Sequence, residues 1–177
     1  MLERAITKRE AVSLATMLNT GLICYKHYMC WADERIMLED EPELYMLELA
    51  ATKHSNTAIS HLNTYAYSEP FQKFDSEDCN DEFVAAEWLR YKRNEISWAT
   101  FLLECGDHTD GNYAREECEY FYYMLNDIED SNYSKFLEDK QSAEVFQRFS
   151  DVIREIESKY NEFLPYLQKY RETYGRV

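Results

Sequence analysis

Residues 146–174 read FQRFSDVIREIESKYNEFLPYLQKYRETY, and this stretch has the most regular hydrophobic pattern in the chain. Apolar and aromatic side chains recur at alternating spacings of three and four residues, which places them on one face of an α-helix. These residues, which we call the seam, are Phe146, Phe149, Ile153, Ile156, Tyr160, Phe163, Leu167, Tyr170 and Tyr174. We predict a long amphipathic helix that buries the seam.

The seam is also long enough for a coiled coil, so the alternative is a homodimer or a larger homo-oligomeric scaffold. Leu, which is typical of alternate coiled-coil positions, occurs in the seam only at Leu167. Pro165 lies inside the run, where it removes a backbone hydrogen-bond donor. We therefore expect a kink between Asn161 and Pro165, with Asn161 capping a renewed helix.

The composition favours an all-α fold. Four Gly and three Pro provide few turns for a β fold, whereas 15 Tyr, nine Phe and three Trp provide bulk for a core. A chain of 177 residues most simply forms one domain. We predict a single all-helical domain over residues 1–177, built as an antiparallel bundle of about six to eight helices.

Several helix boundaries have local signals. Thr7 and Glu10 have the spacing of a capping box, which predicts a first helix over residues 8–19 that ends before Gly21. Further helices are expected over residues 22–39, from a cap at Asp40 through residue 51, over 58–65, over 81–104 and over 114–128. The last helix is expected to begin at a Ser142 cap, after an acidic connector over residues 127–141.

Two segments of the second half are ambiguous. If residues 81–104 form one helix, Glu95 lies on its apolar stripe between Tyr91 and Trp98. The alternative, which we favour, is a break at residues 92–94 with Asn94 capping a new helix, or a paired Glu95. Residues 106–112 contain two glycines and two acids, and we interpret them as a helix–helix loop rather than as a calcium site.

Cysteine usage and hydropathy indicate a cytoplasmic protein. The five cysteines are odd in number and form no C-x-x-C pair, which is typical of a reducing compartment. Residues 1–4 carry no apolar leader region, and no apolar run approaches the roughly 18 to 20 residues that span a bilayer. We expect neither secretion nor membrane insertion.

The net charge of −15 is unevenly distributed. Residues 33–139 contain 26 acidic and eight basic residues, a net charge of −18, whereas the two flanking segments are slightly basic. Nucleic acids and anionic membranes are disfavoured partners, because both attract Lys and Arg rather than carboxylates. The acidity can serve solubility alone, or it can steer the chain toward a basic protein partner.

The longest predicted loop, residues 67–81, combines aromatic residues with acids. Acids in this position can simply complement the dipole of the following helix. They can also steer a basic partner toward aromatic anchors, as in many protein interfaces. The predicted partner-binding residues are Phe71 and Phe74 as anchors and Asp75, Glu77, Asp78 and Asp81 for steering.

We predict no catalytic residue, no metal and no cofactor. The sequence lacks Glu-x-x-His, His-Glu-x-x-His, a Gly-rich phosphate loop and Gly-x-Ser-x-Gly. His27, Cys30 and Glu34 share one helix face but have no second half-site for a metal. The alternative function is a hydrolase or metal-dependent enzyme, whose candidate residues are Glu95, Asp107, His108 and Asp110.

A short run also resembles a known group of proteins. It comprises residues 31–36 (WADERI), Glu41-Pro42 and residues 44–50 (LYMLELA). This run resembles one in small helical bacterial proteins, some of which are proposed immunity partners of polymorphic or contact-dependent toxins. The resemblance implies a helical protein that neutralises a toxin. Together with the charge, it leads us to expect an acidic protein-binding module, most concretely an immunity protein for a basic toxin.

Overall fold

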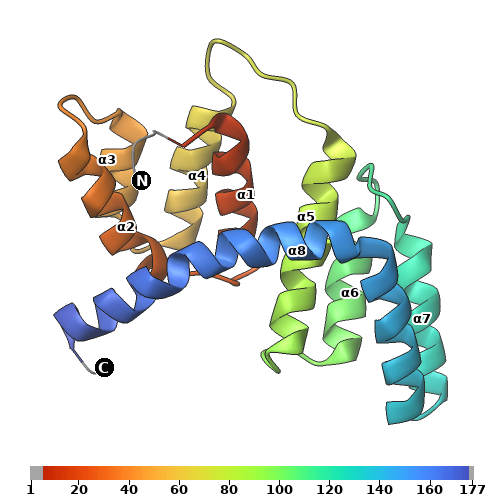
Figure 1. Cartoon of the computed structure of the whole chain (residues 1–177). Helices are drawn as coiled ribbons and strands as arrows, with labels where there is room; N and C mark the ends of the chain where they lie inside the picture. The colour runs from red at the N-terminus through yellow and green to blue at the C-terminus, as the bar shows by residue number, and fades with distance from the viewer. Residues whose placement is uncertain (1–5, 176–177) are drawn as a thin grey trace. The chain divides into compact units, whose positions relative to one another are not determined.

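The computed structural model describes residues 6–175, which form eight α-helices and no strand (Figure 1). Residues 1–4, which we used for the localisation, lie outside this range. The all-α prediction is confirmed. The helices are α1 (Lys8–Asn19), α2 (Tyr25–Leu38), α3 (Leu44–Ala51), α4 (Ser55–Ala66), α5 (Ser76–Lys92), α6 (Trp98–Thr109), α7 (Cys118–Asp130) and α8 (Lys135–Tyr174).

The backbone of the chain divides into two compact units, and the single domain stays a prediction. Unit 1 comprises Met1–Lys73 and Ser158–Val177, and unit 2 comprises Phe74–Glu157. Unit 1 therefore contains α1 to α4 and the last part of α8, whereas unit 2 contains α5 to α7 and the first part of α8. Each unit has its own buried side chains and is described separately.

Unit 1 is built from two packed helix pairs, α1 with α4 and α2 with α3. At the start of α1, the Thr7 hydroxyl accepts from the backbone N–H of Glu10 at 3.2 Å, and the Glu10 carboxylate accepts from the backbone N–H of Thr7. The predicted capping box is therefore confirmed. Trp31 of α2 packs on Phe163 of α8, with ring centroids 5.4 Å apart. The contact between Trp31 and Phe163 joins the last part of α8 to the unit 1 core.

Unit 2 has an aromatic core in which Trp98 and Phe101 stack with centroids 4.7 Å apart. The core also holds a polar link, because the Trp98 indole N–H donates to Gln141 Oε1 at 2.8 Å. The Gln141 amide donates in turn to the carbonyl of Met124 at 3.0 Å. Gln141 is buried, so these bonds replace the water that its amide loses on folding.

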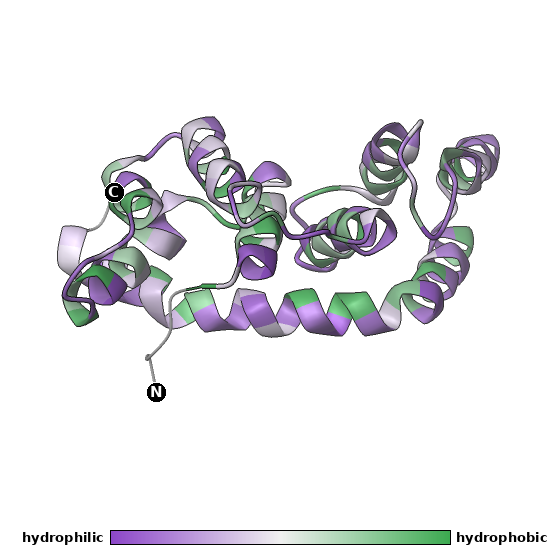
Figure 2. Ribbon diagram, turned by 90° about the horizontal axis from the view of Figure 1, so that it is seen from above, coloured by the Kyte–Doolittle hydropathy of each residue, from purple (hydrophilic) through white to green (hydrophobic). Residues whose placement is uncertain are grey.

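The seam prediction is confirmed in its centre. Its fully or nearly buried members are Phe149, Ile153, Ile156, Tyr160 and Phe163. The ends differ, because Phe146 is 39% exposed and Tyr174 is 53% exposed. Hydrophobic and hydrophilic residues alternate along α8, as Figure 2 shows.

The predicted limits of the last helix are wrong. α8 begins at Lys135, so Ser142 lies inside the helix and the connector after α7 is shorter than expected. The helix also continues through Pro165, and no new helix begins at Asn161. Gln141 and Val145 are buried and precede Phe149 at steps of four, so the inward face extends before the seam.

The predicted break near Lys92 is confirmed, but Asn94 has a different role. Asn94 has a φ of 59°, and the N–H of Glu95 donates to the carbonyl of Arg90 at 3.0 Å. This is the geometry in which a left-handed residue ends a helix. The cap of α6 is Ser97, whose hydroxyl accepts from the backbone N–H of Thr100.

The loop predicted over residues 106–112 begins later, because α6 extends to Thr109. Gly106 lies inside the helix, where an added Cβ would be 2.5 Å from the Tyr122 ring of α7. The glycine therefore permits a close approach of Tyr122 to the α6 backbone.

Candidate functional site

The acidic charge belongs to one of the two units. Unit 1 contains 12 acidic and 11 basic residues, a net charge of −1. Unit 2 contains 22 acidic and eight basic residues, a net charge of −14. The candidate surface for a basic partner therefore lies in unit 2.

The start of α5 carries the first group of exposed acids. Asp75 caps the helix, because its Oδ1 accepts from the backbone N–H of Glu77 at 2.9 Å. Asp78 is exposed, Glu77 is half-buried and lies in the same first turn, and Phe74 precedes the cap and is half-buried. Both the capping role and the surface role predicted for this segment are thus compatible with its position.

A tyrosine from the loop between α6 and α7 is hydrogen-bonded to α5 through its backbone, two residues after Asp78. Asn80 of α5 donates from Nδ2 to the Tyr113 carbonyl at 2.7 Å, and its Oδ1 lies 3.1 Å from His108 Nε2. The His108 ring stacks on Phe83 with centroids 3.7 Å apart. This set of contacts fixes the Tyr113 backbone, whereas Tyr113 as a residue is 71% exposed. We call Phe74, Asp75, Glu77, Asp78 and Tyr113 the α5 patch.

Asp81 does not belong to an exposed surface. It is fully buried, its Oδ1 accepts from the backbone N–H of Arg115 at 3.0 Å, and its Oδ2 lies 2.9 Å from Arg115 Nε. Arg115 also pairs with Asp151 of α8 at 2.9 Å. Burial raises the pKa of Asp81, and the Arg115 contacts oppose that shift. Asp81 therefore joins helices within unit 2, and its predicted steering role is not retained.

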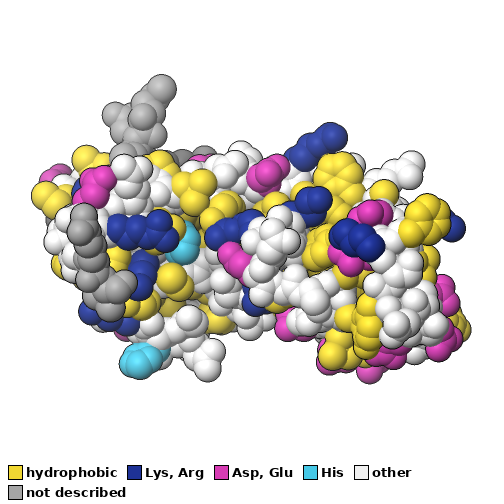
Figure 3. All heavy atoms as spheres, turned by 90° about the horizontal axis from the view of Figure 1, so that it is seen from below, with side chains coloured by type: hydrophobic (Ala, Val, Ile, Leu, Met, Phe, Trp, Pro, Cys, Tyr) yellow, Lys and Arg dark blue, Asp and Glu magenta, His cyan; other side chains and the backbone are white. Residues whose placement is uncertain are grey.

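The outer face of α7 carries a second group that the sequence analysis did not assign to a site. Tyr123 is 69% exposed, and Glu119 and Asp127 are exposed four residues before and after it. Asp130 continues the same face, whereas Phe121, Met124 and Ile128 are buried. Figure 3 shows acidic and hydrophobic side chains exposed together over α7 and the start of α8. We call Glu119, Tyr123, Asp127 and Asp130 the α7 stripe.

The sequence did contain a signal for the α7 stripe. Tyr123 lies outside the apolar positions of its helix, and an acidic residue lies four residues before it and four residues after it. A large aromatic on the polar face of an amphipathic helix is an exception to binary patterning.

Phe71, the other predicted anchor, is 75% exposed in the loop after α4 and lies on the unit 1 side of the division. The beginning of this loop is fixed by Lys8, whose ammonium donates to the carbonyls of Ser68 and Pro70. Phe71 is therefore an exposed aromatic side chain of unit 1, and we do not include it in the α5 patch.

The four residues considered for an enzyme have separate partners. Glu95 pairs with Arg93 at 2.7 Å. Asp107 accepts from the Tyr122 hydroxyl at 2.8 Å, His108 stacks on Phe83, and Asp110 follows the last residue of α6. This arrangement does not provide the shared pocket that the hydrolase hypothesis requires.

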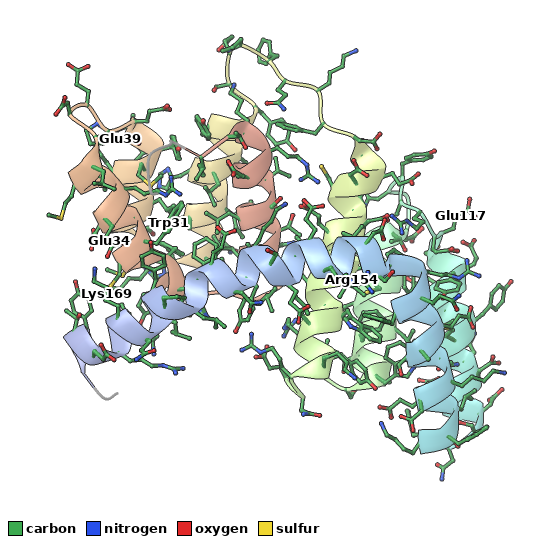
Figure 4. The ribbon with its side chains drawn as sticks, viewed as in Figure 1. Trp31, Glu34, Glu39, Glu117, Arg154 and Lys169 are labelled. Carbon is green, nitrogen blue, oxygen red and sulfur yellow. The ribbon has the colours of Figure 1, made fainter. Side chains whose placement is uncertain are left out.

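The residues considered for a metal also have other contacts. His27 Nδ1 accepts from the backbone N–H of Cys24 at 3.1 Å, and Cys30 is buried. Glu34 is paired with Lys169 of α8, and the two side chains point toward each other in Figure 4. Within residues 6–175, no group of three or more His, Cys, Asp or Glu side chains is arranged to hold a metal ion.

The buried Glu87 and the half-buried His108 have shifted pKa values and lie outside the α5 patch and the α7 stripe. Burial, with a contribution from Glu104, raises the pKa of Glu87 to about 7, although Arg90 Nη1 lies 2.9 Å from its carboxylate. Burial also lowers the pKa of His108. Glu87 pairs with Arg90 and His108 stacks on Phe83, so we assign both side chains a structural role.

Comparison of the chain with protein-family models, curated proteins and solved structures found no match. Among the described residues, no helix combines the length and the apolar character that crossing a membrane requires. All five cysteines are free thiols.

Proposed function

We propose that this protein binds a basic protein partner through the acidic, tyrosine-bearing surface of unit 2. The observation that carries the proposal is the concentration of a −14 net charge in unit 2, together with exposed tyrosines among its acids. The α5 patch and the α7 stripe are the two parts of that surface with both features.

Charge and aromatic residues would contribute at different steps of binding. Exposed carboxylates raise the rate at which a basic partner is encountered, by about 10 to 1,000-fold in favourable cases. Burial of Tyr113 and Tyr123 would then slow dissociation, because desolvated aromatic side chains contribute much of the energy of protein interfaces. Total charge alone does not determine affinity.

An immunity protein is the most concrete form of this proposal. A toxin that acts on nucleic acids needs a basic surface to bind phosphates. An acidic helical protein that covers this surface would exclude the substrate. The free cysteines are compatible with action in a reducing cytoplasm.

Two variants with equal charge changes test the proposal. Glu77→Gln/Asp78→Asn removes two acids of the α5 patch and leaves the Asp75 cap in place. Glu162→Gln/Glu172→Gln removes two exposed acids of the unit 1 part of α8 and is the matched control. Each tagged full-length protein is co-expressed with the products of its neighbouring genes and purified at low salt.

We expect a basic protein to co-purify with the unvaried chain and with the control variant. Its binding to the Glu77/Asp78 variant should be weaker. Tyr113→Ala and Tyr123→Ala should increase the dissociation rate, with the larger effect identifying the patch at the centre of the interface. An acidic partner, or equal loss of binding in the Glu77/Asp78 variant and the control, would contradict the proposal.

If the partner is a nuclease-type toxin, the unvaried chain should inhibit cleavage of nucleic acid at equimolar concentration. The Glu77/Asp78 variant should require a higher concentration for the same inhibition. Binding without inhibition would support the binding function and contradict the immunity function.

A further inference from the structure

The outer face of α3 is apolar and exposed, which is unusual for a helix at a protein surface. Glu48 is the only charged residue among the eight of this helix. It follows Leu44 by four residues, so it lies at the edge of the same face, where it pairs with His61 at 2.9 Å. The inner residues of α3, Tyr45, Met46 and Leu49, are buried. On the other face, Leu44 is 69% exposed and Leu47 is 42% exposed.

Neighbouring residues extend this apolar face. Ala51 is exposed and follows Leu47 by four residues, so it continues the row that Leu44 and Leu47 begin. Met37 and Leu38 end α2, which packs on α3, and they are 84% and 62% exposed. We call Leu44, Leu47 and Ala51 the α3 face.

Four carboxylates lie at one end of the α3 face. They occupy the turn between α2 and α3, where Figure 4 labels Glu39. Within the part of the chain that the structure describes, none of them forms an ion pair. This acidic rim consists of Glu39, Asp40, Glu41 and Glu43.

The rim restricts what can cover the α3 face. A symmetric contact with a second copy would bring the same patches together and place unneutralised acids near each other. An anionic membrane surface would be repelled for the same reason. A partner that carries Lys or Arg beside its apolar residues would neutralise the rim while it buries the leucines.

We propose that the α3 face is a second interaction surface, which binds a basic amphipathic helix of another protein. The row formed by Leu44, Leu47 and Ala51 has the spacing by which one helix packs along another. The partner helix places its apolar face on this row and a cluster of Lys or Arg over the acidic rim. This surface lies in unit 1, so it is separate from the α5 patch and the α7 stripe.

A synthetic helical peptide tests this surface directly. The probe is about 18 residues long, which gives roughly five helical turns, with Leu at spacings of three and four and a cluster of Lys at one end. Three control peptides have the same length: one with Glu in place of the Lys cluster, one with the Lys residues spread evenly, and one with the Leu positions scrambled. Binding is measured by fluorescence anisotropy, and the bound residues are identified from amide chemical shifts of the full chain.

Leu44→Ser/Leu47→Ser should weaken binding of the probe by about tenfold or more, because it removes the central apolar contacts. The matched control is Leu103→Ser, an exposed leucine of unit 2, which should leave affinity unchanged. Replacing the four rim acids by their amides should abolish the preference for the Lys-cluster peptide over the Glu peptide. Circular dichroism establishes that each variant keeps its helices.

Absence of binding by the probe, or equal binding by the unvaried chain and the Leu44/Leu47 variant, would overturn the proposal. A dimer in light scattering that the Leu44/Leu47 variant abolishes would assign the face to a second copy instead. Binding to anionic vesicles that the same variant abolishes would assign it to a membrane. The Glu77/Asp78 variant should bind the probe normally, so this proposal and the proposed function can fail independently.

Discussion

At the scale of single residues, Gly106 shows how one missing side chain determines a contact. In the sequence, Gly106 and Gly111 surround acids and indicate a loop, but the structure continues α6 through Gly106. The Tyr122 ring lies 2.5 Å from the position that a Cβ of residue 106 would take, and its hydroxyl donates to Asp107. No local pattern predicts this contact, because Tyr122 belongs to the next helix.

We predict that Gly106→Ala lowers the free energy of unfolding by up to about 2 kcal/mol. Moving the ring out of its position costs about 1–3 kcal/mol, and the roughly 1 kcal/mol that Ala gains over Gly in a helix offsets part of this cost. Urea denaturation measures the difference. The sign should reverse in a Tyr122→Ala background, where the added methyl group has room. The same destabilisation in both backgrounds would exclude the Tyr122 contact as its cause.

Glu87 should give the stability of the protein a specific pH dependence. Its pKa is raised to about 7 in the folded chain, mainly by burial, whereas an unfolded Glu titrates near about 4.3. Between these values the folded state holds a proton that the unfolded state has lost, so stability falls as the pH rises. The contribution of this group to stability is therefore highest below the unfolded pKa, falls as the pH rises toward about 7, and is lost above that pH.

The comparison with Glu87→Gln isolates this effect from other titrating groups. Between about pH 5 and pH 8, the unvaried chain should lose on the order of 1–3 kcal/mol of unfolding free energy relative to the variant. Urea denaturation at several pH values provides the measurement. Parallel stability curves for the two proteins would show that Glu87 titrates alike in the folded and unfolded states.

At the scale of helices, prediction succeeded where the signal is local. The capping box at Thr7 and Glu10 fixed the start of α1, and the regular seam identified the central part of α8. The sequence does not predict the beginning of α8, because Gln141 is polar and therefore favours a connector. Its burial depends on hydrogen bonds to Trp98 and Met124, which come from other helices.

The buried part of α8 gives a prediction with an internal control. Ile153→Ala and Phe163→Ala should each lower the unfolding free energy by roughly 2–5 kcal/mol, because each leaves a cavity in a packed core. Tyr174→Ala, at the exposed end of the same seam, should change stability by less than about 0.5 kcal/mol. Thermal denaturation of the three variants is the measurement. Equal effects at all three positions would contradict the division of the seam into buried and exposed parts.

At the scale of the whole molecule, the sequence showed the acidity but not its assignment to one unit. A segment count over residues 33–139 crosses α2 to α4, which belong to the nearly neutral unit 1. The site was predicted in part. Asp75, Glu77 and Asp78 lie at the start of α5, but Asp81 is buried against Arg115, which is 34 residues away in the chain. Such a pairing depends on tertiary structure and has no local pattern.

The association rate with the basic partner tests the central claim most directly. For the unvaried chain, this rate should fall steeply between about 0.05 and 0.5 M salt, because ions screen the attraction between exposed charges. The Glu77→Gln/Asp78→Asn variant should associate more slowly at low salt and depend less on salt, whereas Glu162→Gln/Glu172→Gln, in unit 1, should follow the unvaried chain. A rate that is independent of salt, or an equal reduction in both variants, would contradict steering by the acidic surface of unit 2.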